Sequence, residues 1–144
     1  YLACVVLVFF ALLPTLVYYF SIYQLGLPKG NIDSGAVIGS YLGLFLLGGA
    51  FVAIGIFTSS VTKNQVVAFA TAAFVCFFSY SGFDSLAKLF EPNFLATVLL
   101  NLGINTHYEA ISRGVLDTRD LIYFISFTLV FLSATKLTVG GRKW

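Results

Sequence analysis

Charged side chains are scarce in this sequence. Lys and Arg together number 8, Asp and Glu 6, and all four make up 10% of the 144 residues. Soluble domains carry about a quarter of charged residues. The net charge of +2 is scattered along the chain, and nucleic-acid binding calls for a clustered basic face. The composition therefore excludes a soluble globular domain, and we expect no nucleic-acid partner.

Cysteine and histidine are also rare. The two cysteines, Cys4 and Cys76, lie in apolar runs, where a free thiol behaves as a small hydrophobe. A disulfide between them is the alternative. His107 is the only histidine, and no spacing of Cys and His matches a metal site.

Catalytic motifs are missing as well. There is no glycine-rich phosphate loop that ends in Lys and Ser or Thr, so any ATP hydrolysis must take place in another chain. The pattern GxSxG is absent, and the serines of the apolar runs have no partner histidine there. No ionisable residue stands at the middle of an apolar run, where a proton-coupled carrier usually places one. We expect no enzyme activity and no cofactor in this chain.

Apolar residues dominate what is present. The chain is 59% hydrophobic and 17% aromatic, with a mean hydropathy of +0.95. About 20 helical residues cross a hydrocarbon core of about 30 Å. Runs of this length predict four membrane spans, at residues 1–23, 35–59, 64–83 and 119–139. The expected fold is an all-α, polytopic membrane helix bundle that forms a single transmembrane domain over residues 1–144.

Two features of the first apolar run carry further expectations. The run begins at Tyr1 without an initiator Met and is span-like from its first residues, so we expect a segment of a longer polypeptide. Pro14 lies in its middle and predicts a kink, because proline removes a backbone donor and crowds the preceding turn.

Residues 84–118 break the apolar pattern. They mix charges, Gly and Pro with the piece NFLATVLLNL, residues 93–102, which is too short to cross a membrane. We interpret the segment as an external re-entrant or interfacial helical region.

Polar residues predict where the helices of the first half begin. Asp33 or Ser34 can accept hydrogen bonds from the free amides of the second span. Thr62 and Gln65 match a capping box at the start of the third span.

Similar signals occur in the second half. Thr106 and Glu109 match a second capping box, for a short helix around residues 107–113 that Gly114 would end. Asp117 is a candidate N-cap of the last span.

Small residues recur along the second span. In lipid, a stripe of small residues lets helices approach closely, so we assign this one to helix packing, with a flexible gate as the alternative. The stripe consists of Gly35, Gly39, Gly43, Gly48, Gly49 and Ala53.

Charged residues gather around the start of the last span. We expect Arg113, Asp117, Arg119 and Asp120 to form an ion-paired collar at the outer mouth. A metal or acid–base site that includes His107 and Glu109 is the alternative, since imidazole and carboxylates bind zinc and transfer protons. The candidates for an external gate are His107, Glu109, Arg113, Asp117, Arg119 and Asp120.

Basic residues beside the spans predict the orientation. Short segments without acids hold one group: Lys63, Lys136, Arg142 and Lys143. The other group is diluted among all six acids: Lys29, Lys88, Arg113 and Arg119. We therefore place the turn at residues 59–65 and the C-terminus in the cytoplasm, and residues 84–120 outside.

Two motifs carry a family resemblance. They are GSYLGLFLLGGAFVAIGIFTSSVTKNQVVAF, residues 39–69, and HYEAISRGVLDTRDLIYFISF, residues 107–127. Both resemble the permease subunits of ABC-2 type exporters, in particular the gliding-motility-associated ABC transporter permeases of Bacteroidota. The resemblance implies the last four spans of a six-span permease, without its two N-terminal spans, in a bacterial inner membrane.

The same resemblance implies how the chain would work. Two permease copies would form a translocation path in the lipid, driven by a separate ATP-binding subunit that holds ATP and Mg. The remaining cytoplasmic candidates for coupling are Ser59, Ser60, Thr62, Lys63, Asn64 and Gln65. A non-transporting scaffold of a gliding or secretion machine and an ion-coupled carrier are the alternatives, and no residue indicates the substrate.

Overall fold

The computed structural model describes residues 1–26, 33–90 and 94–141, and within these ranges it contains helices and no strand. The prediction of an all-α bundle is therefore confirmed. Four helical stretches are long and apolar enough to cross a membrane: Leu2–Leu25, Ser34–Val61, Gln65–Leu89 and Thr118–Gly140. Three of them match the predicted spans within two residues at each end, and the third continues six residues past position 83. Lys29, Arg142 and Lys143, used above for orientation, lie outside the described residues.

The first span is interrupted at Pro14, as predicted. Helix α1, Leu2–Leu12, passes into a 3₁₀ turn, Leu13–Thr15, and then into α2, Leu16–Leu25. The Thr15 hydroxyl donates to the Leu12 carbonyl oxygen at 2.6 Å and is hydrogen-bonded to the Tyr41 hydroxyl at 3.0 Å. Hydrogen bonds from Ser and Thr hydroxyls to backbone carbonyls, and local 3₁₀ turns, are among the features that let a membrane helix tolerate proline.

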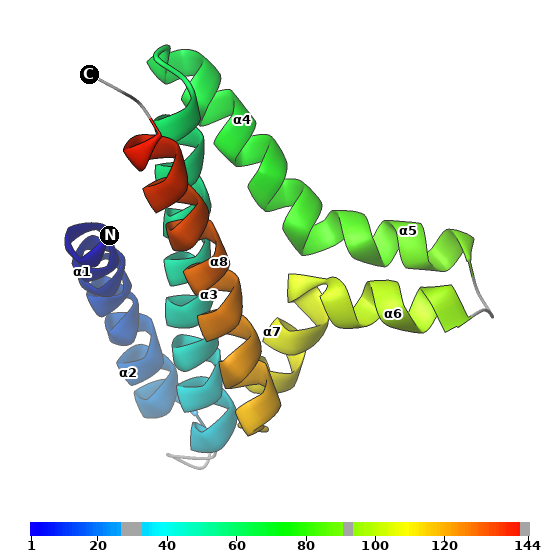
Figure 1. Ribbon diagram of the computed structural model, residues 1–144. Coiled ribbons are helices and arrows are strands. Elements are labelled where there is room, and N and C mark those ends of the chain that lie inside the picture. Colours follow the sequence, from blue (N-terminus) through cyan, green and yellow to red (C-terminus); the bar gives the residue numbers. More distant parts are fainter. Residues whose placement is uncertain (27–32, 91–93, 142–144) are drawn as a thin grey trace.

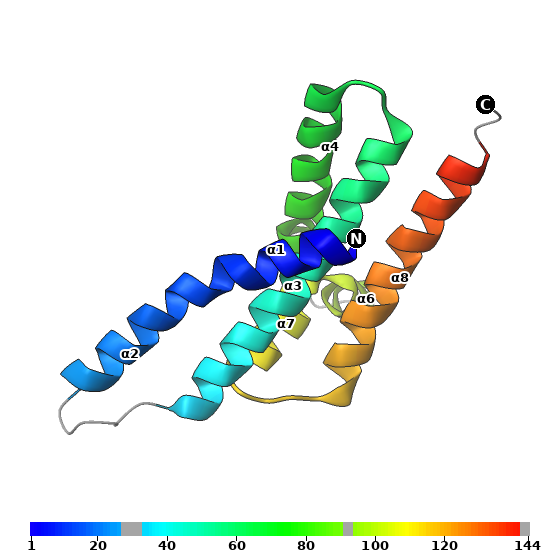
Figure 2. The ribbon, with the colours of Figure 1, turned by 90° about the vertical axis from the view of Figure 1, so that its left-hand side faces the viewer.

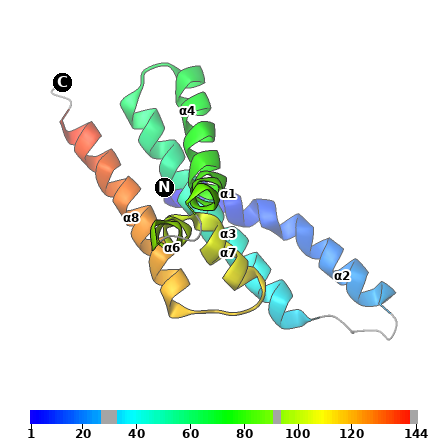
Figure 3. The ribbon, with the colours of Figure 1, turned by 90° about the vertical axis from the view of Figure 1, so that its right-hand side faces the viewer.

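Helix α3, Ser34–Val61, lies at the centre of the molecule. Its N-cap is Asp33, whose Oδ1 accepts from the amides of Gly35 and Ala36. Helix α1 crosses α3 obliquely on one side, while α4, α7 and α8 pack on it elsewhere (Figures 1, 2 and 3). Helix α3 is thus the element that α1, α4, α7 and α8 share as a packing partner.

The third span is bent. Helix α4, Gln65–Phe77, leads into a π-helical turn, Phe78–Gly82, and then into α5, Phe83–Leu89, which runs in a different direction (Figure 1). Insertion of an extra residue per turn is a recognised cause of helix bends. The bend turns α5 sideways, away from the bundle axis.

The predicted re-entrant region folds as a helical excursion between the third and fourth spans. Helix α6, Phe94–Leu102, comes from the short apolar piece and returns alongside α5 (Figure 1). Helix α7, Ile104–Ser112, then packs on α3, and α8, Thr118–Gly140, returns along α3. The external location of residues 84–118 stays a prediction.

Both predicted capping boxes are wrong. Thr62 has extended backbone at the end of α3, and the side chain that caps α4 is Asn64, whose Oδ1 accepts from the amides of Val66 and Val67. Helix α7 begins at Ile104, two residues before Thr106, and its N-cap Gly103 has no side chain. An N-cap must be the last non-helical residue, which neither threonine is.

The cap assignment predicts different effects for two neighbouring substitutions. Asn64→Ala is expected to lower the free energy of unfolding by about 1 kcal/mol, because two α4 amides lose their acceptor. Thr62→Ala removes only one bond, from the Asn64 amide, and is the matched control with a smaller effect. Thermal unfolding in detergent micelles compares the two, and equal losses would contradict the assignment.

The tightly packed core is small. Its fully enclosed members are Ala50, Ile104, Ile111 and Phe124, where α3, α7 and α8 meet. In contrast, many large apolar side chains face outward, among them Leu2, Phe69, Phe94 and Leu137, each at least 75% exposed. Such continuous apolar surface suits lipid and is rare on monomers in water. The surface therefore agrees with a membrane protein.

Candidate functional site

The small residues of α3 are packing residues, as predicted, but they serve two faces. A Cβ on Gly39 would overlap the Ile111 carbonyl oxygen, and a Cβ on Gly43 would lie 3.3 Å from Tyr108 and Ile111 of α7. A Cβ on Gly48 would instead lie 2.7 Å from Cγ1 of Val8 on α1. The stripe therefore binds α7 on one side and α1 on another.

The remaining members of the stripe have different surroundings. The backbone of Gly35 lies against Gly114, two residues past the end of α7, while Gly49 faces the Tyr1 hydroxyl of the first span. Ala53 is fully buried. At 100° per residue, positions 39 and 48 point to opposite sides of a helix, so a single face was too simple an interpretation.

The turn after α7 brings two backbones together. Gly114 has φ +82°, a left-handed conformation that favours glycine, and its amide donates to the Ile111 carbonyl oxygen at 2.9 Å. A Cβ there would lie 3.1 Å from the Ala36 amide nitrogen on α3. The Ser40 hydroxyl of α3 also donates to the Ser112 carbonyl oxygen at 3.1 Å. The predicted role of Gly114 as a helix stop is confirmed.

His107 lies at the junction of α6, α7 and α8. Its Nδ1 is 2.6 Å from Oδ1 of Asp120, and its Nε2 is 3.0 Å from the carbonyl oxygen of Asn101. The two side chains are largely enclosed, with exposed fractions of 17% for His107 and 9% for Asp120. We call this group, together with Tyr123, the junction cluster.

Tyr123 completes the junction cluster. Its ring stacks on the imidazole of His107, with centroids 4.0 Å apart and an interplanar angle of 21°. Its hydroxyl donates to the Leu102 carbonyl oxygen at 2.6 Å. The last carbonyls of a helix lack partners within it, so His107 and Tyr123 both satisfy the end of α6.

A second polar group links α5 to α7. The side-chain Nδ2 of Asn105 donates to Oδ2 of Asp84 at 2.7 Å and to Oε1 of Glu109 at 3.2 Å. Glu109 also pairs with Arg113 at 3.1 Å. Oδ1 of Asp84 is buried and has no hydrogen-bond partner among the described residues. These side chains line a cavity of about 400 Å³ together with Leu100, Thr106 and Ala110.

The structure does not form the predicted collar. Arg113 pairs with Glu109 on its own helix, and Asp120 pairs with His107. Asp117 caps α8 by accepting from the Arg119 amide at 3.0 Å, as predicted. Within the described ranges the Arg119 side chain makes no ion pair. The α7–α8 turn separates the four residues that sequence proximity had grouped.

The alternative of a metal site finds no support in the geometry. Among the described residues, no three His, Cys, Asp or Glu side chains converge as a metal site requires. The cysteines are unpaired within the same ranges, as expected: Cys4 is exposed and Cys76 is half-buried.

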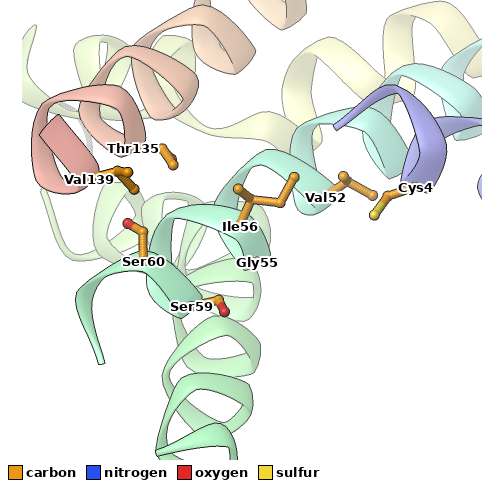
Figure 4. A pocket seen from close by; sticks show the side chains of 8 residues that line it. All are labelled: Cys4, Val52, Gly55, Ile56, Ser59, Ser60, Thr135 and Val139. Carbon is orange, nitrogen blue, oxygen red and sulfur yellow. The ribbon is translucent and has the colours of Figure 1, made fainter. Parts of the chain in front are cut away.

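The far ends of α3 and α8 also meet. The hydroxyls of Ser60 and Thr138 are hydrogen-bonded at 2.7 Å, so the end of α8 lies beside the α3–α4 turn (Figure 1). A cavity of about 480 Å³ opens next to this contact between α1, α3 and α8 (Figure 4). Its lining consists of Cys4, Val52, Gly55, Ile56, Ser59, Ser60, Thr135 and Val139.

The coupling candidates lie around the same turn. Ser59, Lys63, Asn64 and Gln65 are exposed, whereas Ser60 and Thr62 are partly covered. The grouping of Lys63 with the end of α8 on one side of the bundle is therefore reproduced, and the identity of that side stays a prediction.

Comparisons with protein-family models, with curated proteins and with solved structures find no match to this chain. The geometry of the junction cluster and of the α3–α4 turn is thus the basis for any functional conclusion.

Several residues of these clusters escaped the sequence analysis. Tyr123 and Asn105 lie in apolar or short helical stretches where they resemble ordinary helix residues. Asp84 gave a signal, because it is the first charge after Lys63, but its partner Asn105 is 21 residues away in the sequence.

Proposed function

We propose that the chain is the transmembrane permease subunit of an ABC-2 type exporter, in a bacterial inner membrane, with ATP hydrolysis in a separate subunit. One observation carries this proposal. Two short helices, α6 and α7, lie between the last two membrane-length stretches, where the resemblance implies an external re-entrant segment.

The α3–α4 turn supports a coupling role. It is short, it is exposed at Lys63 and Asn64, and it is contiguous with α3, which contacts α1, α4, α7 and α8. A protein that bound this turn and displaced it would shift α3, and with it the helices that pack on α3. In the proposed mechanism, closure of the ATP-binding subunits tilts the spans and opens a path beside them.

A photo-crosslinking experiment tests this function. Lys63 is replaced by a photoreactive residue in the full-length protein, which is irradiated in its native membrane and purified. We expect a covalent adduct with an ATP-binding subunit, identified by mass spectrometry, and ATP hydrolysis in the purified complex.

The matched control is the same replacement at Lys88, which is also exposed and lies at the end of α5. We expect no adduct with the ATPase from that position. An intact, purified protein with neither a crosslinked nor a co-purified ATPase would overturn the exporter proposal and favour a scaffold. Ion-driven uptake into ATP-free vesicles would instead favour the carrier.

A further inference from the structure

The hydrogen bonds of His107 indicate how many protons the junction cluster holds. The Asn101 carbonyl oxygen can only accept, so the contact of 3.0 Å requires a hydrogen on Nε2. The contact of 2.6 Å between Nδ1 and Oδ1 of Asp120 requires a second hydrogen between these atoms. The junction cluster therefore holds one proton more than a neutral imidazole beside a carboxylate.

Two helix ends indicate where the second proton lies. The imidazole stands at the C-terminal end of α6, where the helix dipole stabilises a positive charge. Asp120 is in the first turn of α8, where the dipole stabilises a negative charge. The Tyr123 ring against the imidazole face adds a cation–π attraction. All three effects favour an imidazolium–carboxylate pair over two neutral groups.

Few other charged side chains are available to pair with His107 or Asp120. Helices α3 and α6 pack around the junction and contain no acidic or basic residue. On α7, Glu109 is engaged by Arg113 and Asn105. On α8, Asp117 caps the helix, and Arg119 makes no ion pair within the described ranges. On α5, Asp84 is bonded to Asn105 and Lys88 is exposed.

We propose that His107 and Asp120 form a proton-binding site that holds α6, α7 and α8 together. With the proton bound, the imidazolium joins Asp120 of α8 to the end of α6. Without it, the one remaining ring hydrogen stays on Nδ1, because a hydrogen bond to the charged carboxylate is stronger than one to the Asn101 carbonyl oxygen. Nε2 then presents a lone pair to that carbonyl oxygen, so loss of one proton breaks the contact with the end of α6. The proposal rests on this geometry and is independent of the exporter function.

The single histidine makes a direct test possible. In the full-length protein labelled with ¹⁵N-histidine and held in detergent micelles, His107 contributes the only histidine ring signals of residues 1–144; His107→Gln identifies them. We expect both ring nitrogens to carry hydrogen at low pH. On raising the pH, loss of the second hydrogen and loss of the protected Nε2–H signal should occur together. A ring with unprotonated Nδ1 at low pH, or proton loss with Nε2–H still protected, would overturn the proposal.

Asp120→Asn is the matched variant that separates the proton from the packing. The new amide can donate to Nδ1 while Nε2–H still donates to Asn101, so a neutral imidazole satisfies both contacts. We expect Nε2–H to stay protected as the pH is raised through the range in which the native protein loses it. If this variant lost the Nε2–H signal at the same pH as the native protein, the tie would not depend on the shared proton.

Discussion

Gly39→Ala is expected to lower the free energy of unfolding by about 3 kcal/mol, the upper end of typical overpacking costs. The added methyl group would overlap the Ile111 carbonyl oxygen and lie 2.9 Å from the Gly114 Cα, both of which are backbone atoms. Backbone cannot turn aside as a side chain can, so α7 must move away from α3. The core residue Ile111 would move with it.

Gly55→Ala is the matched control for this prediction. It lies on the same helix, and no atom lies within 4 Å of its hypothetical Cβ. Alanine is favoured over glycine in a helix interior by about 1 kcal/mol, so this variant should be as stable as the native protein or more so. Thermal unfolding in micelles, followed by circular dichroism, measures both. Equal behaviour of the two variants would contradict close packing of α3 against α7.

Phe124→Ala is expected to cost about 2–3 kcal/mol. The ring is 1% exposed and fills the space between α3, α7 and α8. Soluble proteins lose about 3–5 kcal/mol for this change. Part of that loss is the free energy of moving the ring between water and the protein core. This part is smaller here because separated membrane helices remain in lipid. The lost packing contacts account for the rest.

Phe69→Ala is the corresponding control on the lipid-facing side. Its ring is 75% exposed on α4, so its removal leaves no cavity in the bundle. We expect a change within about 0.5 kcal/mol, the usual range for surface substitutions. Reversible unfolding in micelles would measure both variants. A loss at Phe69 as large as that at Phe124 would indicate that the outer face of α4 is covered by another protein surface.

The spans could be predicted from the sequence because composition and length determine them. A run such as residues 34–62 has no charge, and nothing but a long apolar helix accommodates it in lipid. The exact ends were less predictable. Thr62 and Asn64 are both good N-cap residues, and the choice depends on where α3 ends, which is a matter of tertiary packing.

The junction cluster could not be predicted, although His107 and Asp120 were both named as candidates. The 12 residues between them include the turn at Gly114, whose left-handed backbone the sequence pattern alone does not convert into a position for α8. Sequence proximity favoured Arg113 as the partner of the acids near α8. In the structure Arg113 instead pairs with Glu109, four residues earlier in the chain.

The length of α3 has a mechanical consequence. Its 28 residues extend over about 42 Å at 1.5 Å per residue. Near one end, Ser60 is tied to Thr138, and near the other, Gly39 rests against the backbone of the α7 turn. A tilt of about 5° about one end would displace the other by about 4 Å over this length. If α3 turned as a rigid rod, a small rotation at the exposed turn would therefore become a shift larger than the length of a hydrogen bond at the turn after α7.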